Sequence, residues 1–309
     1  MQPFVASPAR AILLKVLSVA IFVGMQTMIK FAGQLPAGQI VFFRSFFAVL
    51  PVLAMLAWQR ELAFAFRTSR PGGHIFRGVI GVTSMGFGFF ALTRLPLPEA
   101  IVLNYAQPLL VVLISAVVLH EAVRVYRWTA VAIGLVGVVI IVWPQLTLLE
   151  AGIGSEQAAG VVAALISAAV SAVALLQVRS LVTTERSSTI VLWFSLVAAV
   201  AGLCTFPFGW SALTTAQALF LIAAGLCGGV AQILMTESYR HASVATVAPF
   251  EYTSILFGIV VGYLAFSEVP TFYTIAGGAI VVGSGLFIIW REHRLGLERG
   301  TARKVAPPQ

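Results

Sequence analysis

The sequence predicts an all-α integral membrane protein with ten transmembrane helices, arranged as two inverted five-helix repeats. Composition supports the membrane class, because 60% of the 309 residues are hydrophobic and only 10% are charged, whereas soluble proteins carry roughly 25% charged residues. So much apolar surface cannot be hidden in one globular core, and the chain must therefore be solvated by lipid. Long apolar runs predict the helices, and an internal sequence repeat predicts that they form two similar halves.

Ten apolar runs are long enough for a helix to cross a bilayer, which takes about 20 residues. They lack the alternation of a membrane β-barrel, so they predict helices. The first run follows Arg10, as in a signal peptide, but it is long and no small-x-small cleavage site follows it, which indicates a retained helix. In chain order the predicted helices are 11–32, 37–58, 73–93, 98–119, 127–143, 157–180, 188–207, 214–236, 243–266 and 270–290.

Basic residues gather on one side of the membrane. If the N-terminus is inside, the outer side receives little beyond Lys30 and Arg94. The inner side receives the basic residues of the C-terminal tail together with Arg10, Arg60, Arg67, Arg70, Arg77, Arg124, Arg127, Arg186 and Arg240. This is the positive-inside pattern, and it predicts a multi-pass protein of a bacterial inner membrane with both termini cytoplasmic. Residues 292–309 are expected to form a disordered, basic cytoplasmic tail.

An internal repeat appears when the sequence is shifted by 147 residues, the separation of Gly78 and Gly225. No gap is needed from Gly78 to Trp143. Other identities in this register are Gly81 with Gly228, Tyr105 with Tyr252, Leu109 with Leu256, Glu121 with Glu268, Tyr126 with Tyr273 and Trp143 with Trp290. We interpret them as a duplication, with repeats in 11–143 and 156–291. Five helices per repeat is an odd number, so the second repeat enters the membrane inverted, as in many secondary transporters, with a binding site expected where the halves meet.

The motif "FFRSFF" in the second helix, and an acidic residue after the fourth and ninth helices, resemble the drug/metabolite transporter superfamily and its EamA branch. The segments "VFFRSFFAVLPVL" (41–53), "SRPGGHIFRGVIG" (69–81) and "APFEYTSILFGIVVGYLAFSEVP" (248–270) are similar to bacterial members assigned to uptake of S-adenosylmethionine or riboflavin. The chain departs from the organellar sugar-phosphate and nucleotide-sugar carriers, which rely on lysines in their late helices. Its lysines, Lys15, Lys30 and Lys304, lie elsewhere.

Glu251 is the first candidate for transport chemistry. It lies about ten residues into the helix predicted at 243–266, hence roughly 15 Å deep and near the midplane of a ~30 Å core. An ionised carboxylate is costly there, so we predict that Glu251 couples transport to protons or binds a cationic substrate. The alternative is a structural carboxylate that pairs with an arginine or caps freed backbone groups.

Prolines are expected to loosen two helices beside polar side chains. Pro249 cannot donate a hydrogen bond to the carbonyl of Ala245, and Pro108 cannot donate one to that of Asn104. Asn104 is the repeat counterpart of Glu251. Interrupted helices beside midplane polar residues are typical of a transport site, although prolines are also common in membrane helices without such a role.

Two charged residues have open interpretations. Arg44, about seven residues into the second helix, either extends to lipid headgroups or pairs with a substrate carboxylate or with Glu251. Glu237, with Tyr239, ends the eighth helix and is either a gate or an interfacial anchor. Glu121 and Glu268 are expected to cap or anchor helix ends.

Aromatic and amide side chains form the candidate lining of the binding site. The alternative for each is packing or an interhelical hydrogen bond. The predicted lining residues are Gln177, Trp193, Gln232, Tyr105 and Tyr252.

Missing motifs argue against an enzyme, a metal site and a cofactor. The sequence has no phosphate-binding loop, no aspartate, and neither an H-E-x-x-H nor a G-x-S-x-G motif. Because the net charge of +8 reflects the positive-inside pattern, we expect no nucleic-acid partner. The expected partners are the lipid bilayer, a small-molecule substrate and, as a candidate coupling ion, the proton; monomer and homodimer both stay open.

We therefore predict a secondary transporter that moves a small metabolite by alternating access. The resemblance implies uptake of a riboflavin-like or S-adenosylmethionine-like compound. Export of amino acids or drugs is the alternative within transport, and a non-transport membrane scaffold is the alternative outside it.

Overall fold

The computed structural model is all-helical over the residues that it describes, which are 8–60, 62, 65–117, 125–150, 156–181, 185, 187–241 and 248–305. Eight helices in these ranges are long and apolar enough to cross a membrane, and two shorter apolar helices cover Trp128–Pro144 and Phe250–Phe266. The elements are α1 (Pro8–Phe31), α2 (Ala37–Trp58), α3 (Pro71–Leu92), α4 (Leu97–Asn104), α5 (Ala106–Val117), α6 (Val125–Glu150), α7 (Glu156–Leu181), α8 (Ser187–Leu203), η2 (Phe206–Phe208), α9 (Thr215–His241), η3 (Ala248–Tyr252), α11 (Thr253–Phe266) and α12 (Phe272–Val305).

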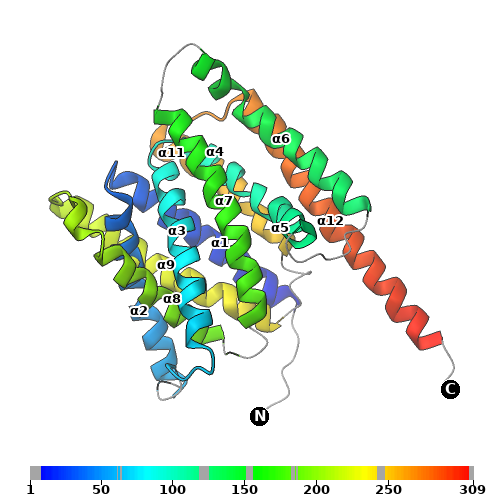
Figure 1. Ribbon diagram of the computed structural model, residues 1–309, viewed down its shortest axis with the longest axis horizontal. Helices are drawn as coiled ribbons and strands as arrows, with labels where there is room; N and C mark the ends of the chain where they lie inside the picture. The colour runs from blue at the N-terminus through cyan, green and yellow to red at the C-terminus, as the bar shows by residue number, and fades with distance from the viewer. Residues whose placement is uncertain are drawn as a thin grey trace.

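The helices pair across the two repeats (Figure 1). The first helix of one repeat packs against the third helix of the other, which gives the pairs α1 with α9 and α7 with α3. Equivalent helices of the two repeats also pack against each other, as α2 with α8, α4 with α11 and α6 with α12. This reciprocal pairing is what an in-plane two-fold axis between inverted repeats produces. The interior of the bundle is therefore an interface between the repeats.

The pair α6 and α12 runs side by side along one edge of the bundle in Figure 1, and α12 extends beyond it. Gly137 and Gly277 allow this close crossing, because a Cβ atom on Gly137 would lie 2.8 Å from the carbonyl oxygen of Gly277. Small residues that let two backbones approach are the usual contact between membrane helices. The pair supplies an outer wall, whereas the remaining helices enclose the polar residues.

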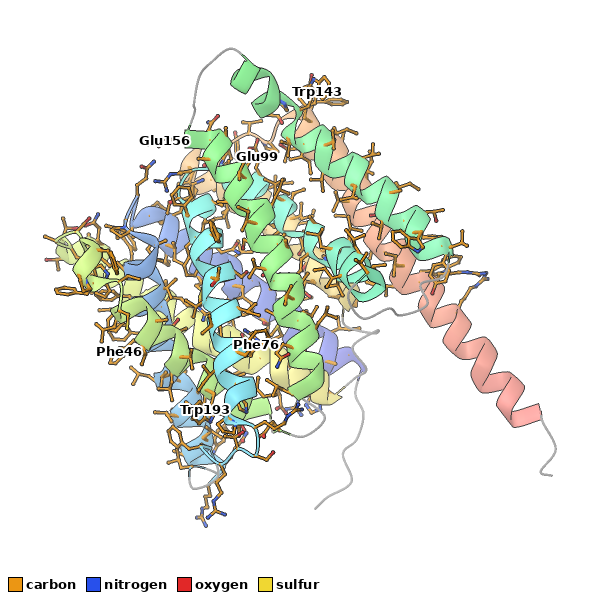
Figure 2. The ribbon with its side chains drawn as sticks, in the orientation of Figure 1. Phe46, Phe76, Glu99, Trp143, Glu156 and Trp193 are labelled. Atoms are coloured by element: carbon orange, nitrogen blue, oxygen red, sulfur yellow. The ribbon has the colours of Figure 1, made fainter. Side chains whose placement is uncertain are left out.

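Apolar side chains cover much of the outer surface. Phe46 on α2 and Phe76 on α3 are about half exposed, at 49% and 52%, and both are labelled among the side chains in Figure 2. Buried clusters of leucine, valine, isoleucine and alanine fill the interior. An apolar exterior around a packed interior fits a lipid solvent.

Three predicted elements need correction. The helix expected at 98–119 is divided at Tyr105 into α4 and α5, and the one expected at 243–266 begins, within the described residues, as the short 3-10 helix η3. The tail expected to be disordered from residue 292 is helical to Val305, because α12 continues without interruption.

Candidate functional site

Two repeat-equivalent tyrosines mark the helix interruptions. Tyr105 follows the last residue of α4, and its backbone N–H bonds to the carbonyl of Val102 at 3.0 Å, a tighter turn than an α-helix makes. Tyr252 ends η3 and precedes α11. Pro108 stands in the first turn of α5 and Pro249 in η3, so both prolines accompany an interrupted helix. The backbone is therefore irregular at the same place in each repeat.

The two tyrosines meet. Their ring centroids are 4.7 Å apart with planes tilted by 34°. The Tyr105 hydroxyl donates to the backbone carbonyl of Glu251 at 2.6 Å and lies 2.6 Å from the hydroxyl of Ser254. Since a phenol has one proton, Ser254 is then the donor in the second hydrogen bond. These contacts join the two helix interruptions directly.

Glu251 forms an ion pair with Lys15 of α1. The Lys15 Nζ lies 3.2 Å from the Glu251 Oε2, and the two side chains are 1% and 49% exposed, respectively. Arg44 is therefore not the partner of Glu251. Glu251 also lies in η3, two residues before α11, rather than inside a continuous helix. Its repeat counterpart Asn104 is exposed at the end of α4.

A second charged group lies where α1 ends. Lys30 pairs with Glu268 and also donates to the carbonyl of Leu95 at 2.7 Å. The other Glu268 oxygen accepts the backbone N–H of Leu97 at 2.7 Å, which caps the first turn of α4. The predicted capping role of Glu268 is thus confirmed, whereas Glu121 lies outside the described residues.

Glu99 extends this second group. It is buried and accepts a hydrogen bond from the Thr274 hydroxyl at 3.2 Å. Together with Glu268 it ties α4 of the first repeat to α11 and α12 of the second. Figure 2 places Glu99 and Trp193 toward opposite ends of the bundle.

Arg44 and Trp193 lie in a third polar region, which α2, α3, α8 and α9 enclose. Arg44 is buried, at 7% exposure, and its guanidinium lies close enough to Arg77 of α3 for the two charges to repel. Arg77 stacks on Phe194, with its Cζ 4.4 Å from the ring centroid. Trp193 stacks on His74 at 5.7 Å between centroids. The extension of Arg44 to headgroups is excluded by this burial.

Glu185, in the loop between α7 and α8, joins this third region to the residues that precede α3. Glu185 accepts hydrogen bonds from the hydroxyls of Thr68 and Ser69, both at 2.9 Å, and lies 3.8 Å from the His74 Nε2. Desolvation acts to raise the pKa of Glu185, but these hydrogen bonds and the nearby His74 outweigh it and lower the pKa below that of an ordinary carboxyl. Glu185 therefore ties the second repeat to the start of α3.

The remaining predicted residues are more scattered. Gln177 of α7 lies near Gly73, with its Nε2 3.9 Å from where a Cβ atom of that glycine would stand. Gln232 is half-buried on α9. Glu237 lies 3.7 Å from His241 one turn further along α9, which fits an anchor at a helix end. The predicted lining therefore does not gather in one place: Tyr105 and Tyr252 meet, Trp193 lies against His74, and Gln177 and Gln232 lie on α7 and α9.

Three residues in these groups were not among the sequence-predicted site residues. Lys15 was noted only as one of three lysines, although a lysine inside an apolar run is itself a signal. Glu99 follows a proline-rich connection and reads as a helix start. Arg77 was assigned to the inner surface with the other arginines of the positive-inside pattern, because the sequence does not show which way a side chain extends.

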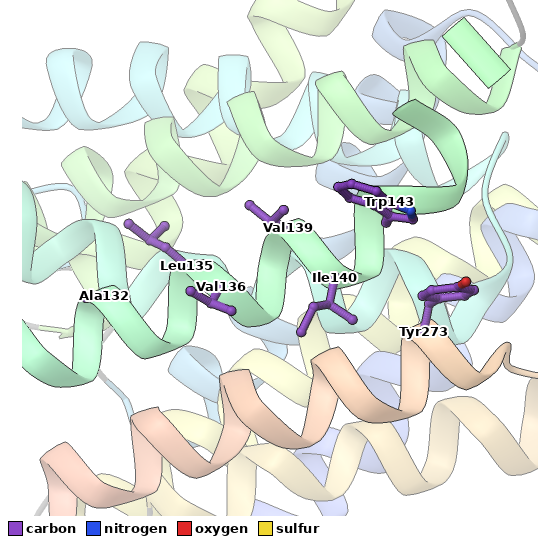
Figure 3. Close-up of a pocket in the computed structure, with 7 residues that line it drawn as sticks. All are labelled: Ala132, Leu135, Val136, Val139, Ile140, Trp143 and Tyr273. Atoms are coloured by element: carbon purple, nitrogen blue, oxygen red, sulfur yellow. The ribbon is translucent and has the colours of Figure 1, made fainter. Parts of the chain in front are cut away.

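The groove drawn in Figure 3 runs along α6 and is lined by Ala132, Leu135, Val136, Val139, Ile140, Trp143 and Tyr273. Most of these side chains are exposed on the membrane-facing surface. The groove is apolar, so it suits a lipid chain better than a polar metabolite. Among the described residues, no three histidine, cysteine or glutamate side chains gather as a metal site.

Comparison with known proteins gives a consistent family. The model of the EamA-like transporter family matches residues 9–143 and 158–290. A pseudopaline exporter of Pseudomonas aeruginosa is 32% identical over 88% of this chain and 93% of its own length. A riboflavin transporter of Rhizobium johnstonii is 30% identical over 84% and 83%, and an S-adenosylmethionine uptake transporter of Rickettsia prowazekii is 25% identical over 86% and 88%.

A solved crystal structure also resembles the chain. It superposes with a TM-score of 0.63 at 21% identity, over 91% of this chain and 97% of the other. At this identity the likeness shows the fold alone.

Proposed function

The chain belongs to the EamA-like transporter family, and on that premise we propose that it takes up a small metabolite resembling S-adenosylmethionine or riboflavin by alternating access. We place it in a bacterial inner membrane with both termini in the cytoplasm, in keeping with the positive-inside pattern. A relative named as an S-adenosylmethionine uptake transporter supports the uptake direction and the first substrate, and a relative named as a riboflavin transporter supports the second substrate.

The observation that carries alternating access is the contact of Tyr105 with Tyr252. These residues are repeat equivalents, each stands at a helix interruption, and their rings are 4.7 Å apart. Two inverted repeats can exchange their conformations, which opens the space between them first to one side and then to the other. A contact between equivalent residues lies on the axis of that exchange, so it can persist in both states.

Glu251 is the proposed coupling residue. Its carboxylate is 49% exposed while its partner Lys15 is fully buried, so a proton or a substrate cation can reach the carboxylate and compete with the lysine. Neutralising Glu251 would remove the charge that faces the buried Lys15, which is unfavourable. Binding at Glu251 would thus bias the two conformations differently, which is what coupling requires.

Export is the second candidate, and a specific observation favours it. The pseudopaline exporter is 32% identical over 88% of the chain, a higher identity than that of the riboflavin transporter or the S-adenosylmethionine uptake transporter named above. Inverted repeats work in either direction, since the gradient decides the net flux.

The test is transport by cells that express the protein, against cells with an empty vector. Uptake of labelled S-adenosylmethionine and of labelled riboflavin is measured first, and loss of the same compounds from preloaded cells second. We expect accumulation of one of the two. Loss from preloaded cells without accumulation would replace uptake by export, and no flux of either compound in either direction would contradict both proposed substrates.

A further inference from the structure

Arg44, which is buried, and Arg77, which is half-buried, form a pair of cations without a counterion among the described residues. Arg44 is 7% exposed, its Nε is buried without a hydrogen-bond partner, and so are the Nε and Nη1 of Arg77. Within the described part of the chain, neither guanidinium has an ion pair. The loop carboxylate Glu185 already accepts hydrogen bonds from Thr68 and Ser69 and pairs with His74. Two like charges that are largely removed from solvent are unfavourable unless an anion joins them.

The direction of the Arg77 side chain reinforces this conclusion. Arg77 lies six residues into α3, so a snorkelling side chain would reach back to the nearby bundle end. Its Nη1 instead lies beside Gly81, one turn deeper, only 2.1 Å from where a Cβ atom of Gly81 would stand. The guanidinium therefore extends into the bundle, close enough to Arg44 for the two charges to repel.

Repeat-equivalent glycines make room for both guanidinium groups. Gly228 of α9 is the counterpart of Gly81, and a Cβ atom there would lie 3.3 Å from the Arg44 Nε and 3.6 Å from its Nη2. The two arginines themselves are not repeat equivalents, since Arg44 lies on the second helix and Arg77 on the third. Each repeat thus contributes a glycine without which one arginine would be displaced.

Helix α8, which covers Arg77 through Phe194, also carries a free donor. The Trp193 Nε1 is buried without a hydrogen-bond partner, and an indole nitrogen can only donate. Phe194 covers one face of Arg77. A group that fits here must supply acceptor oxygens and negative charge, and guanidinium groups bind carboxylate and phosphate oxygens in a two-pronged geometry.

We propose that Arg44 and Arg77 bind the carboxylate of the transported substrate. This assignment rests on the proposed transport function and narrows it. S-adenosylmethionine carries a carboxylate and riboflavin does not, so the arginine pair favours a substrate with an amino-acid end over a flavin. The shared chemistry is an anionic oxygen group, and a phosphate from a metabolite or a lipid headgroup is the competing source.

The test is thermal unfolding of the purified full-length protein, which needs no knowledge of the true substrate. Sodium acetate is compared with sodium chloride at equal ionic strength, with acetamide as the neutral analogue and sodium phosphate as the competing anion. At about ten times its Kd a ligand raises the Tm of a protein of this size by about 2 °C or more. We expect that rise with acetate and not with acetamide.

Variants separate the arginine pair from general salt effects. Arg44→Gln and Arg77→Gln should remove the acetate response, whereas Arg70→Gln, which neutralises an exposed arginine at the start of α3, should keep it. Without added anion, Arg44→Gln should unfold at the same temperature as the wild type or higher, because it removes a repelling charge. A structural arginine would instead lower the Tm when it is replaced.

Several outcomes would overturn the assignment. The first is no rise in Tm with acetate in the wild type. The second is an equal loss of the acetate response in Arg70→Gln. The third is a Tm of Arg44→Gln below that of the wild type when no anion is added. A response to phosphate alone would replace the carboxylate by a phosphate, and loss of that response on extraction of bound lipid would identify a headgroup as its source. Because the Tm measurement reports anion binding, its result can contradict the arginine assignment without contradicting the transport function, and the flux assay can do the reverse.

Discussion

Two lysines of α1 pair with glutamates at opposite ends of α11, yet the two ion pairs differ in construction. Lys15 and Lys30 are 15 residues apart, which is about 22 Å along a helix. At one end Glu251 leaves 49% of its side chain exposed. At the other, Glu268 is 18% exposed and also accepts the backbone N–H of Leu97.

The pair of Lys15 with Glu251 is exchangeable, whereas the pair of Lys30 with Glu268 is fixed. Glu268 is held by a lysine and a helix N-terminus, so another ligand would have to replace both at once. The Glu251 side chain is about half exposed, so a proton or a cation can reach its carboxylate and compete with Lys15. The fixed pair, together with Glu99 and Thr274, closes the end of the bundle where α1 ends, while the exchangeable pair stays accessible.

The largest effect is expected from Glu251→Gln. The change keeps the shape of the side chain but removes the charge that Lys15 faces, so flux of the transported compound should fall at least about tenfold, which corresponds to about 1.4 kcal/mol. The measurement is initial flux in cells at several pH values. Glu156→Gln, which alters an exposed carboxylate bonded to Gln34, is the matched control. Unchanged flux and unchanged pH dependence would make Glu251 a structural residue.

A mixed effect on stability and flux is expected from Glu268→Gln. The variant loses an ion pair and weakens the cap of α4, at a cost of about 1–3 kcal/mol, so the Tm should fall and flux should decrease severalfold without disappearing. Labelling of a single cysteine at Ala100, in a chain whose Cys204 and Cys227 are replaced, should also become faster from the outer side. A Tm equal to that of the wild type would contradict the fixed character of this pair.

The smallest effect is expected at the tyrosine contact. Tyr105→Phe removes the hydroxyl that bonds to the Glu251 carbonyl and to Ser254, which should cost about 1 kcal/mol and reduce flux by about fivefold or less. Tyr252→Phe is the control within the repeat, because no described residue forms a hydrogen bond with the Tyr252 hydroxyl. Equal losses in both variants would show that the rings matter and the hydroxyl of Tyr105 does not.

Several parts of the site were within reach of the sequence. Glu251 and the repeat register were visible because a carboxylate in an apolar run and a series of spaced identities are local signals. Pro108 and Pro249 were expected to loosen their helices, and both accompany an interruption. The partner of Glu251 was not predictable, because Lys15 lies 236 residues away and only the packing of the helices brings them together.

The sequence by itself determined the membrane environment, the family and the inverted duplication, since these follow from composition, from spacing and from the odd number of helices in each repeat. Tertiary structure alone decided which charges have partners. Lys15 takes Glu251 and Lys30 takes Glu268, which leaves Arg44 facing Arg77. The physical reason is that pairing in a low-dielectric interior depends on distances of a few ångströms between helices far apart in the chain, which no pattern along one chain records.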